Sequence, residues 1–104
     1  MATTPLEGVT VTAFRWENDT STYTNQGSDT TDALGEYEIS GLWQGRSYKV
    51  KFEKNGYLAI YYADTGFKAD LETGGPIYMT TDLEVDATLS QGGTISGTVE
   101  GEIP

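Results

Sequence analysis

The chain has 104 residues, which suits one domain and leaves no room for a second hydrophobic core. It contains no Cys and no His, so disulfides, cysteine nucleophiles, histidine bases and the commonest zinc ligands are excluded. The 16 acidic and 6 basic residues give a formal charge of −10, which disfavours binding to nucleic acids and to anionic membranes. No apolar run of about 18 residues is present, so we expect no membrane insertion.

Short alternations of apolar and polar residues predict β-strands that each bury one face. The pattern begins at Val9, Val11 and Ala13 and returns after each group of turn residues, whereas helical spacing does not appear. Segment 63–76 has the weakest pattern and is expected to be a loop, with one helical turn considered at 69–71. The predicted strands are 8–14, 21–25, 36–40, 46–54, 57–62, 77–79, 83–89 and 94–99.

Acidic residues near the first turns raise the question of a metal site. Asp29, Asp32 and Gly35 resemble half of a calcium loop, but the regular Asp spacing and the late Glu of such a loop are missing. We expect Asp32 to cap a β-turn in which Gly35 has a positive φ. The acidic clusters Glu17/Asp19 and Asp82/Glu84/Asp86 are interpreted as solvated faces, and no metal or other cofactor is predicted.

The most specific pattern in the chain places a turn, a strand, a tight corner and a second strand in sequence. It consists of Asp32-x-x-Gly35-x-Tyr37-x-Ile39-x-Gly41-Leu42 followed by Gly45-x-x-Tyr48-x-Val50. This pattern resembles carboxypeptidase-regulatory-like domains, and further likeness covers most of the chain except 63–80. The resemblance implies an all-β, seven- to eight-stranded antiparallel Greek-key sandwich of the transthyretin-like class, similar to carbohydrate-binding-like and Cna-B-like domains. Such modules occur in many parents, so the resemblance says little about function.

The order of the segments differs from that family. The strand that opens the family pattern matches 94–99, which here closes the chain, and the segment that should follow it matches 5–11. One unit of a tandem array, cut out of phase, explains this order, and a permuted domain is the alternative. The missing first strand would leave an open edge. We expect 94–99 to fill it within its own chain, or alternatively in a neighbour, as a swapped dimer or a head-to-tail assembly. The residues of this strand are Thr94, Ile95, Ser96, Gly97, Thr98 and Val99.

Exposed aromatic rings are the one indication of a ligand. Rings on a rigid sandwich can stack on sugars, and nearby polar side chains can then hydrogen-bond to the sugar hydroxyls. The alternative is that one of the paired tyrosines belongs to the core and that Trp43 covers one end of the sandwich. The candidate binding residues are Trp16, Trp43, Tyr61, Tyr62, Asn18, Asp19 and Gln44.

These observations predict a non-catalytic spacer module of a secreted or cell-surface repeat protein, which positions adhesive or catalytic domains. Its partners would be neighbouring repeats of the same parent, and the alternative function is carbohydrate binding, with a glycan or a host surface protein as partner. No catalytic residue is predicted, since the chain lacks His, Cys and a convergent acid–base pair. The domain is expected to span 5–99, with 1–4 as a vector-derived start or linker and 100–104 as a linker to the next repeat.

Overall fold

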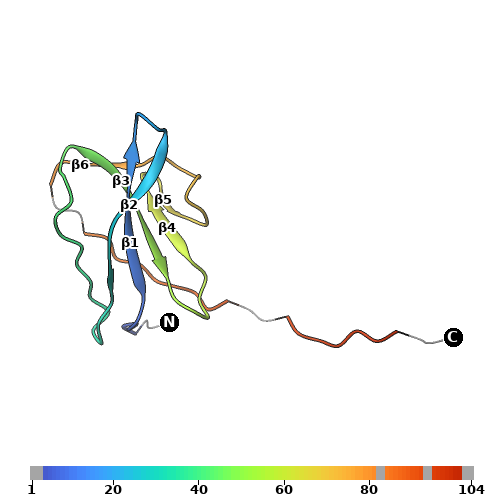
Figure 1. Cartoon of the computed structure of the whole chain (residues 1–104). Helices are drawn as coiled ribbons and strands as arrows, with labels where there is room; N and C mark the ends of the chain where they lie inside the picture. The colour runs from blue at the N-terminus through green and yellow to red at the C-terminus, as the bar shows by residue number, and fades with distance from the viewer. Residues whose placement is uncertain (1–3, 82–83, 93–94, 102–104) are drawn as a thin grey trace.

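The computed structural model describes residues 4–81, 84–92 and 95–101. This part of the chain is all-β, without a helix, and forms one antiparallel sheet of six strands in the order β2-β1-β3-β4-β5, with β6 also paired to β3 (Figure 1). The strands are β1 (Thr10–Glu17), β2 (Thr22–Thr30), β3 (Arg46–Glu53), β4 (Ile60–Ala63), β5 (Gly66–Lys68) and β6 (Ile77–Met79).

Strand β3 is the centre of the sheet and has partners along both of its edges. Strand β1 pairs with one edge, from Thr10 opposite Glu53 to Arg15 opposite Tyr48. The other edge is shared, because β4 pairs with Val50–Phe52 and β6 pairs with Arg46–Tyr48. The ladder hydrogen bonds of β3 are therefore distributed over three neighbouring strands.

The buried core lies on one face of this sheet. The register places Val11 opposite Phe52 and Ala13 opposite Val50, so their side chains share that face. Val11 is 0% exposed and Phe52 is 3% exposed. Two segments outside the strands cover them, one through Tyr37 and Ile39 and the other through Val85 and Leu89. The complete cluster also includes Val9, Leu6, Ile60 and Tyr62.

A β-bulge adjusts the sheet to one of these covering segments. The pairing of β1 with β2 shifts between Ala13 and Phe14, which leaves Gln26 as an extra residue on β2. Gly27 follows with a φ of 155°, and a Cβ atom there would lie 3.3 Å from Cγ2 of Ile39. Glycine at this position therefore lets Ile39 pack directly onto the sheet.

The opposite face of the sheet buries a lysine. Lys49 is 1% exposed, and its ammonium group donates hydrogen bonds to the carbonyl oxygens of Leu71 (2.6 Å), Thr73 (3.1 Å) and Gly74 (2.6 Å). The same ammonium lies 5.0 Å from the ring centre of Tyr23. Burial of a charge is tolerated only where such partners replace water, so Lys49 fixes the loop after β5 to the sheet.

The prediction of an all-β chain is confirmed, and the strand predicted at 77–79 has the observed bounds. Strands predicted at 8–14, 21–25, 46–54 and 57–62 are present with shifted ends. The helical turn considered at 69–71 was wrong, because these residues form bends in which Asp70 accepts hydrogen bonds from the backbone and hydroxyl of Thr73. Strand β5 was not predicted.

Three predicted strands are absent from the described residues. Segments 36–40 and 84–89 are non-strand segments that pack on the core, and 95–99 is an exposed segment without strand structure. At 36–40 the predicted alternation is nevertheless present, since Tyr37 and Ile39 are half-buried between exposed neighbours. The predicted pattern of burial is therefore correct, but in the described residues no neighbouring strand forms backbone hydrogen bonds with 36–40 that would make it a strand. Residues 83 and 94 of these predictions lie outside the described part.

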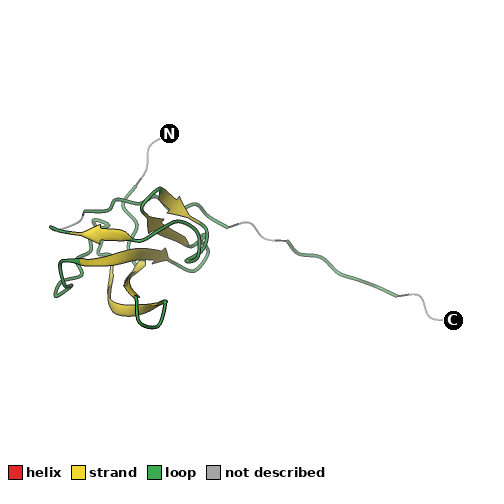
Figure 2. Cartoon of the chain, turned by 90° about the horizontal axis from the view of Figure 1, so that it is seen from above, coloured by secondary structure: helices red, strands yellow, loops and turns green. Residues whose placement is uncertain are grey.

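The C-terminal segment 95–101 leaves the sheet and extends away from it in both views (Figures 1 and 2). Ile95 is 102% exposed and Val99 is 99% exposed. The radius of gyration is 17.6 Å, whereas a closed domain of this length has about 13 Å. The prediction that 94–99 closes its own sheet is therefore wrong for 95–99 in this structure.

Candidate functional site: an open groove over the core

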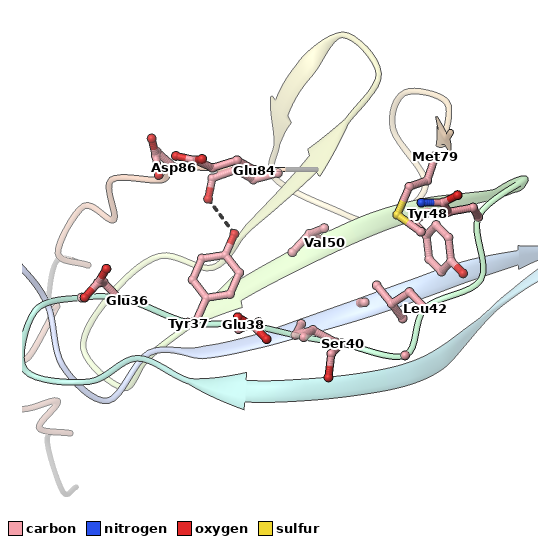
Figure 3. A pocket seen from close by; sticks show the side chains of 16 residues that line it. Glu36, Tyr37, Glu38, Ser40, Leu42, Tyr48, Val50, Met79, Glu84 and Asp86 are labelled. Atoms are coloured by element: carbon pink, nitrogen blue, oxygen red, sulfur yellow. Dashed lines mark hydrogen bonds between the residues drawn. The ribbon is translucent and has the colours of Figure 1, made fainter. Parts of the chain in front are cut away.

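A broad hollow lies over the core face of the sheet. It is a groove of about 790 Å³ between segment 35–42 and residues 84–86, and Ala13, Tyr48 and Val50 form its floor. In Figure 3, Tyr37 reaches from the first wall towards Glu84 and Asp86 on the second, while Leu42, Tyr48 and Met79 gather at the other end. We refer to this hollow as the groove.

Asp29, near the end of β2, and Asp32, in the turn that follows, hold the first wall in place. Oδ1 of Asp32 accepts hydrogen bonds from the backbone N–H groups of Leu34 (2.9 Å) and Glu36 (3.0 Å). The N–H of Gly35 bonds to the Asp32 carbonyl at 2.9 Å, and Gly35 has a φ of 75°, which confirms the predicted turn. Oδ2 of Asp29 accepts a hydrogen bond from the N–H of Glu38 at 2.8 Å.

These bonds also bear on the calcium hypothesis. The carboxylates of Asp29 and Asp32 both accept backbone hydrogen bonds, so their role is to orient the wall. Within 4–81, 84–92 and 95–101, no cluster of three or more acidic residues is placed to hold a metal ion. Glu17 of the first acidic cluster accepts hydrogen bonds from Arg15 and Thr24, and Asp82 of the second lies outside the described part.

Both walls present backbone groups without protein partners. From 39 to 42, the described part of the chain offers no hydrogen-bond partner to any backbone N–H or C=O. In 84–89, the carbonyl of Val85 is the one backbone group with such a partner in the described structure. Backbone donors and acceptors normally pair, so these two non-strand walls leave backbone groups open to water or to a partner on either side of an apolar floor.

Among the described residues, one hydrogen bond crosses the groove. The hydroxyl of Tyr37 donates to the carbonyl oxygen of Val85 at 2.6 Å (dashed in Figure 3). Burial, together with the negative charges of Asp86 and Glu84, raises the pKa of Tyr37 from its ordinary value of 10.0 to about 12. The rim is acidic, because Glu36, Glu38, Glu84 and Asp86 line the opening. The groove thus favours occupants without negative charge.

The predicted sugar-binding residues do not form one surface. Along β1, Arg15 shares the core face with Val11 and Ala13, whereas Trp16 points to the opposite face. Trp16 packs edge-on against Tyr23 at 5.0 Å between ring centres, and its indole N–H donates to Oδ1 of Asn18 at 2.7 Å. Asn18 and Asp19 are exposed just after β1.

Trp43 lies at the core-face end of the sheet, near the groove. It is 59% exposed, and the guanidinium carbons of Arg15 and Arg46 lie 4.9 Å and 5.3 Å from its ring centre. Arg15 also bonds to Oε1 of Glu17 at 2.7 Å, which helps to lower the pKa of that carboxyl. A second hollow of about 210 Å³ lies beside Trp43 and is lined by Arg15, Gln26, Gly41, Leu42 and Tyr48.

The paired tyrosines divide between the two faces, which agrees with the alternative that one of them belongs to the core. Tyr62 is opposite Val50 and packs on the core. The ring centres of Tyr62 and Phe67 are 5.0 Å apart. Tyr61 is opposite Lys51, whose ammonium lies 5.7 Å from its ring centre. Tyr62 is therefore a core contact, and Tyr61 is on the face opposite Trp43.

Two features that shape this site were not predicted from the sequence. The alternation of 46–54 places Lys49 and Lys51 on one polar face, and no local signal distinguishes the buried Lys49 from the partly exposed Lys51. The groove was also missed as a cavity, because its walls are separated by more than forty residues along the chain. The signal available was the matching alternation of its two walls.

Comparisons of the chain with protein-family models, with curated proteins and with solved structures returned no match. The resemblance to carboxypeptidase-regulatory-like domains therefore stays a prediction. The described residues contain no helix that is long and apolar enough to cross a membrane.

Proposed function

We propose that this chain is a non-catalytic structural module of a secreted or cell-surface repeat protein, where it acts as a spacer between adhesive or catalytic domains. In this proposal the module is a transthyretin-like Greek-key sandwich whose second layer is completed by a neighbouring repeat. The observation that carries it is the groove, with its two walls of unpaired backbone over a floor of Ala13, Tyr48 and Val50.

The chemistry of the groove suits a β-strand better than a small substrate. Small-molecule sites combine an apolar lining with a few converging polar groups that fix the ligand. Here the carboxylates of Glu36, Glu38 and Glu84 sit on exposed positions at the rim, and the polar groups along the walls belong to the backbone. Backbone edges recognise another backbone, in any sequence that alternates suitably.

A tandem chain of three copies tests this proposal. If each copy is a spacer, the maximum dimension from small-angle X-ray scattering should increase by a constant step with each added copy. The interior copies should also melt at a higher temperature than an isolated chain, because their grooves are filled. A maximum dimension that grows as for freely jointed domains, with unchanged melting, would contradict the spacer function.

Carbohydrate binding is the second candidate function, and the exposure of Trp43 beside a 210 Å³ hollow favours it. Arg15 and Gln26 line this hollow and could hydrogen-bond to sugar hydroxyls or carboxylates. Glycan-array binding that is lost in Trp43→Ala and retained in Trp16→Ala would support it, since the two rings lie on opposite faces. If the unaltered chain bound no glycan on the array, carbohydrate binding would be ruled out.

A further inference from the structure

We propose that the groove receives residues 95–99 of a second copy of this chain as an added β-strand. The inference rests on the proposed function, because it names the partner segment that completes the module.

The tail, residues 95–101, contains the pattern of a strand with one apolar face. Ile95, Gly97 and Val99 alternate with Ser96 and Thr98, so two apolar side chains and a glycine share one face. Both apolar side chains are fully exposed in the isolated chain. An exposed, alternating strand with unpaired backbone tends to pair with an available sheet edge.

The groove matches this segment in backbone and in charge. A strand laid between 39–42 and 84–86 would meet unpaired N–H and C=O groups on both sides. Its apolar face would lie on Ala13 and Val50, and its hydroxyl-bearing face would point to solvent. Residues 95–99 carry no charge, so the acidic rim does not repel them, and the first acidic residue of the tail is Glu100.

The path of the chain favours a second copy over the chain's own tail. Two backbone hydrogen bonds anchor the segment before the tail, from Leu58 N–H to the Ser90 carbonyl (2.8 Å) and from Gly92 N–H to the Gly56 carbonyl (2.9 Å). Beyond this anchor the tail runs away from the sheet (Figures 1 and 2). Insertion would exchange the Tyr37–Val85 hydrogen bond for ladder bonds along both walls.

The test compares two double variants of the full chain by sedimentation and light scattering over a range of concentrations. Ile95→Asp/Val99→Asp places charges on the face that would be buried, and Ser96→Asp/Thr98→Asp places the same charges on the solvent face. All four positions are exposed in the isolated chain, so neither variant should alter the melting of the dilute protein. We expect the unaltered chain to associate, the first variant to bind at least about a hundredfold more weakly, and the control to lose less than about fivefold.

Several results would overturn this inference. The first is a single-chain mass for the unaltered protein up to about 1 mM. The second is that both variants self-associate as strongly as the unaltered chain. The third is that both variants lose self-association to the same extent. A monomer whose amides 95–99 resist hydrogen exchange would assign the groove to the chain's own tail. The proposed function is tested separately by the three-copy chain, so a monomeric single chain with an extended, stabilised tandem would overturn the inference and leave the spacer function standing.

Discussion

Strand β3 and segment 36–42 have the same alternating pattern and opposite structural outcomes. Tyr48, Val50 and Phe52 of β3 face the core, as do Tyr37 and Ile39 of the segment. However, β3 has strand partners on both edges, whereas 39–42 has none in the described part of the chain. Alternation therefore determines which side chains are buried, and the presence of a neighbour determines whether the backbone becomes a strand.

The largest expected effect comes from shortening a core side chain of the paired strand β3. Phe52→Ala should lower the free energy of unfolding by about 3–5 kcal/mol, because Phe52 is 3% exposed and a packed core relaxes only partly around the cavity left behind. Ile39→Ala in the open segment should cost less than about 2 kcal/mol, since Ile39 is only half-buried. Urea denaturation of both variants measures the difference, and equal losses would show that the open segment is as firmly packed as β3.

The buried lysine gives the next largest effect. Lys49→Ala should lower the free energy of unfolding by about 2–3 kcal/mol, because it removes the hydrogen-bond donor of three carbonyl groups under loop 69–75. Lys51→Ala is the matched control. Its ammonium is partly exposed and pairs with Glu53 at 2.6 Å, so the loss should stay below about 1 kcal/mol. Urea denaturation measures both losses, and similar values for the two lysines would contradict the role given to Lys49.

The hydrogen bond across the groove should give a smaller, pH-dependent effect. Tyr37→Phe should cost about 1 kcal/mol near neutral pH through loss of the bond to Val85. Because folding raises the pKa of Tyr37 to about 12, its protonated form stabilises the fold fully below pH 10.0, and this contribution is lost as the pH rises through 12.

The alkaline part of this prediction is measured by melting temperature from pH 9 to pH 12, that is, from about one unit below the ordinary pKa of 10.0 up to the raised pKa of about 12. The unaltered chain should lose stability over this range more steeply than Tyr37→Phe. Parallel curves for the two proteins would show that Tyr37 titrates as an exposed phenol.

The sequence allowed prediction of the all-β class, of the turn at Asp32 and Gly35, and of which residues face the core, because these depend on local alternation and turn chemistry. It did not allow prediction that 36–40 and 84–89 lack strand partners in the described structure, because pairing depends on segments distant in the chain. Burial of Lys49 also escaped prediction, because it depends on carbonyl groups that a later loop brings to it. Of the candidate ligand residues, Trp16 and Trp43 looked equivalent in sequence. Strand parity places Trp16 on one face, whereas Trp43 contacts Arg15, which points to the other face.

Amide hydrogen exchange at two protein concentrations tests most directly whether the groove is a strand-binding site filled by another copy. At high concentration, the amides of 39–42 should become protected while those of β3 remain equally protected at both concentrations. At low concentration, 39–42 should exchange almost as fast as an unstructured peptide. Protection of 39–42 that does not change with concentration, whether high or absent, would contradict this account.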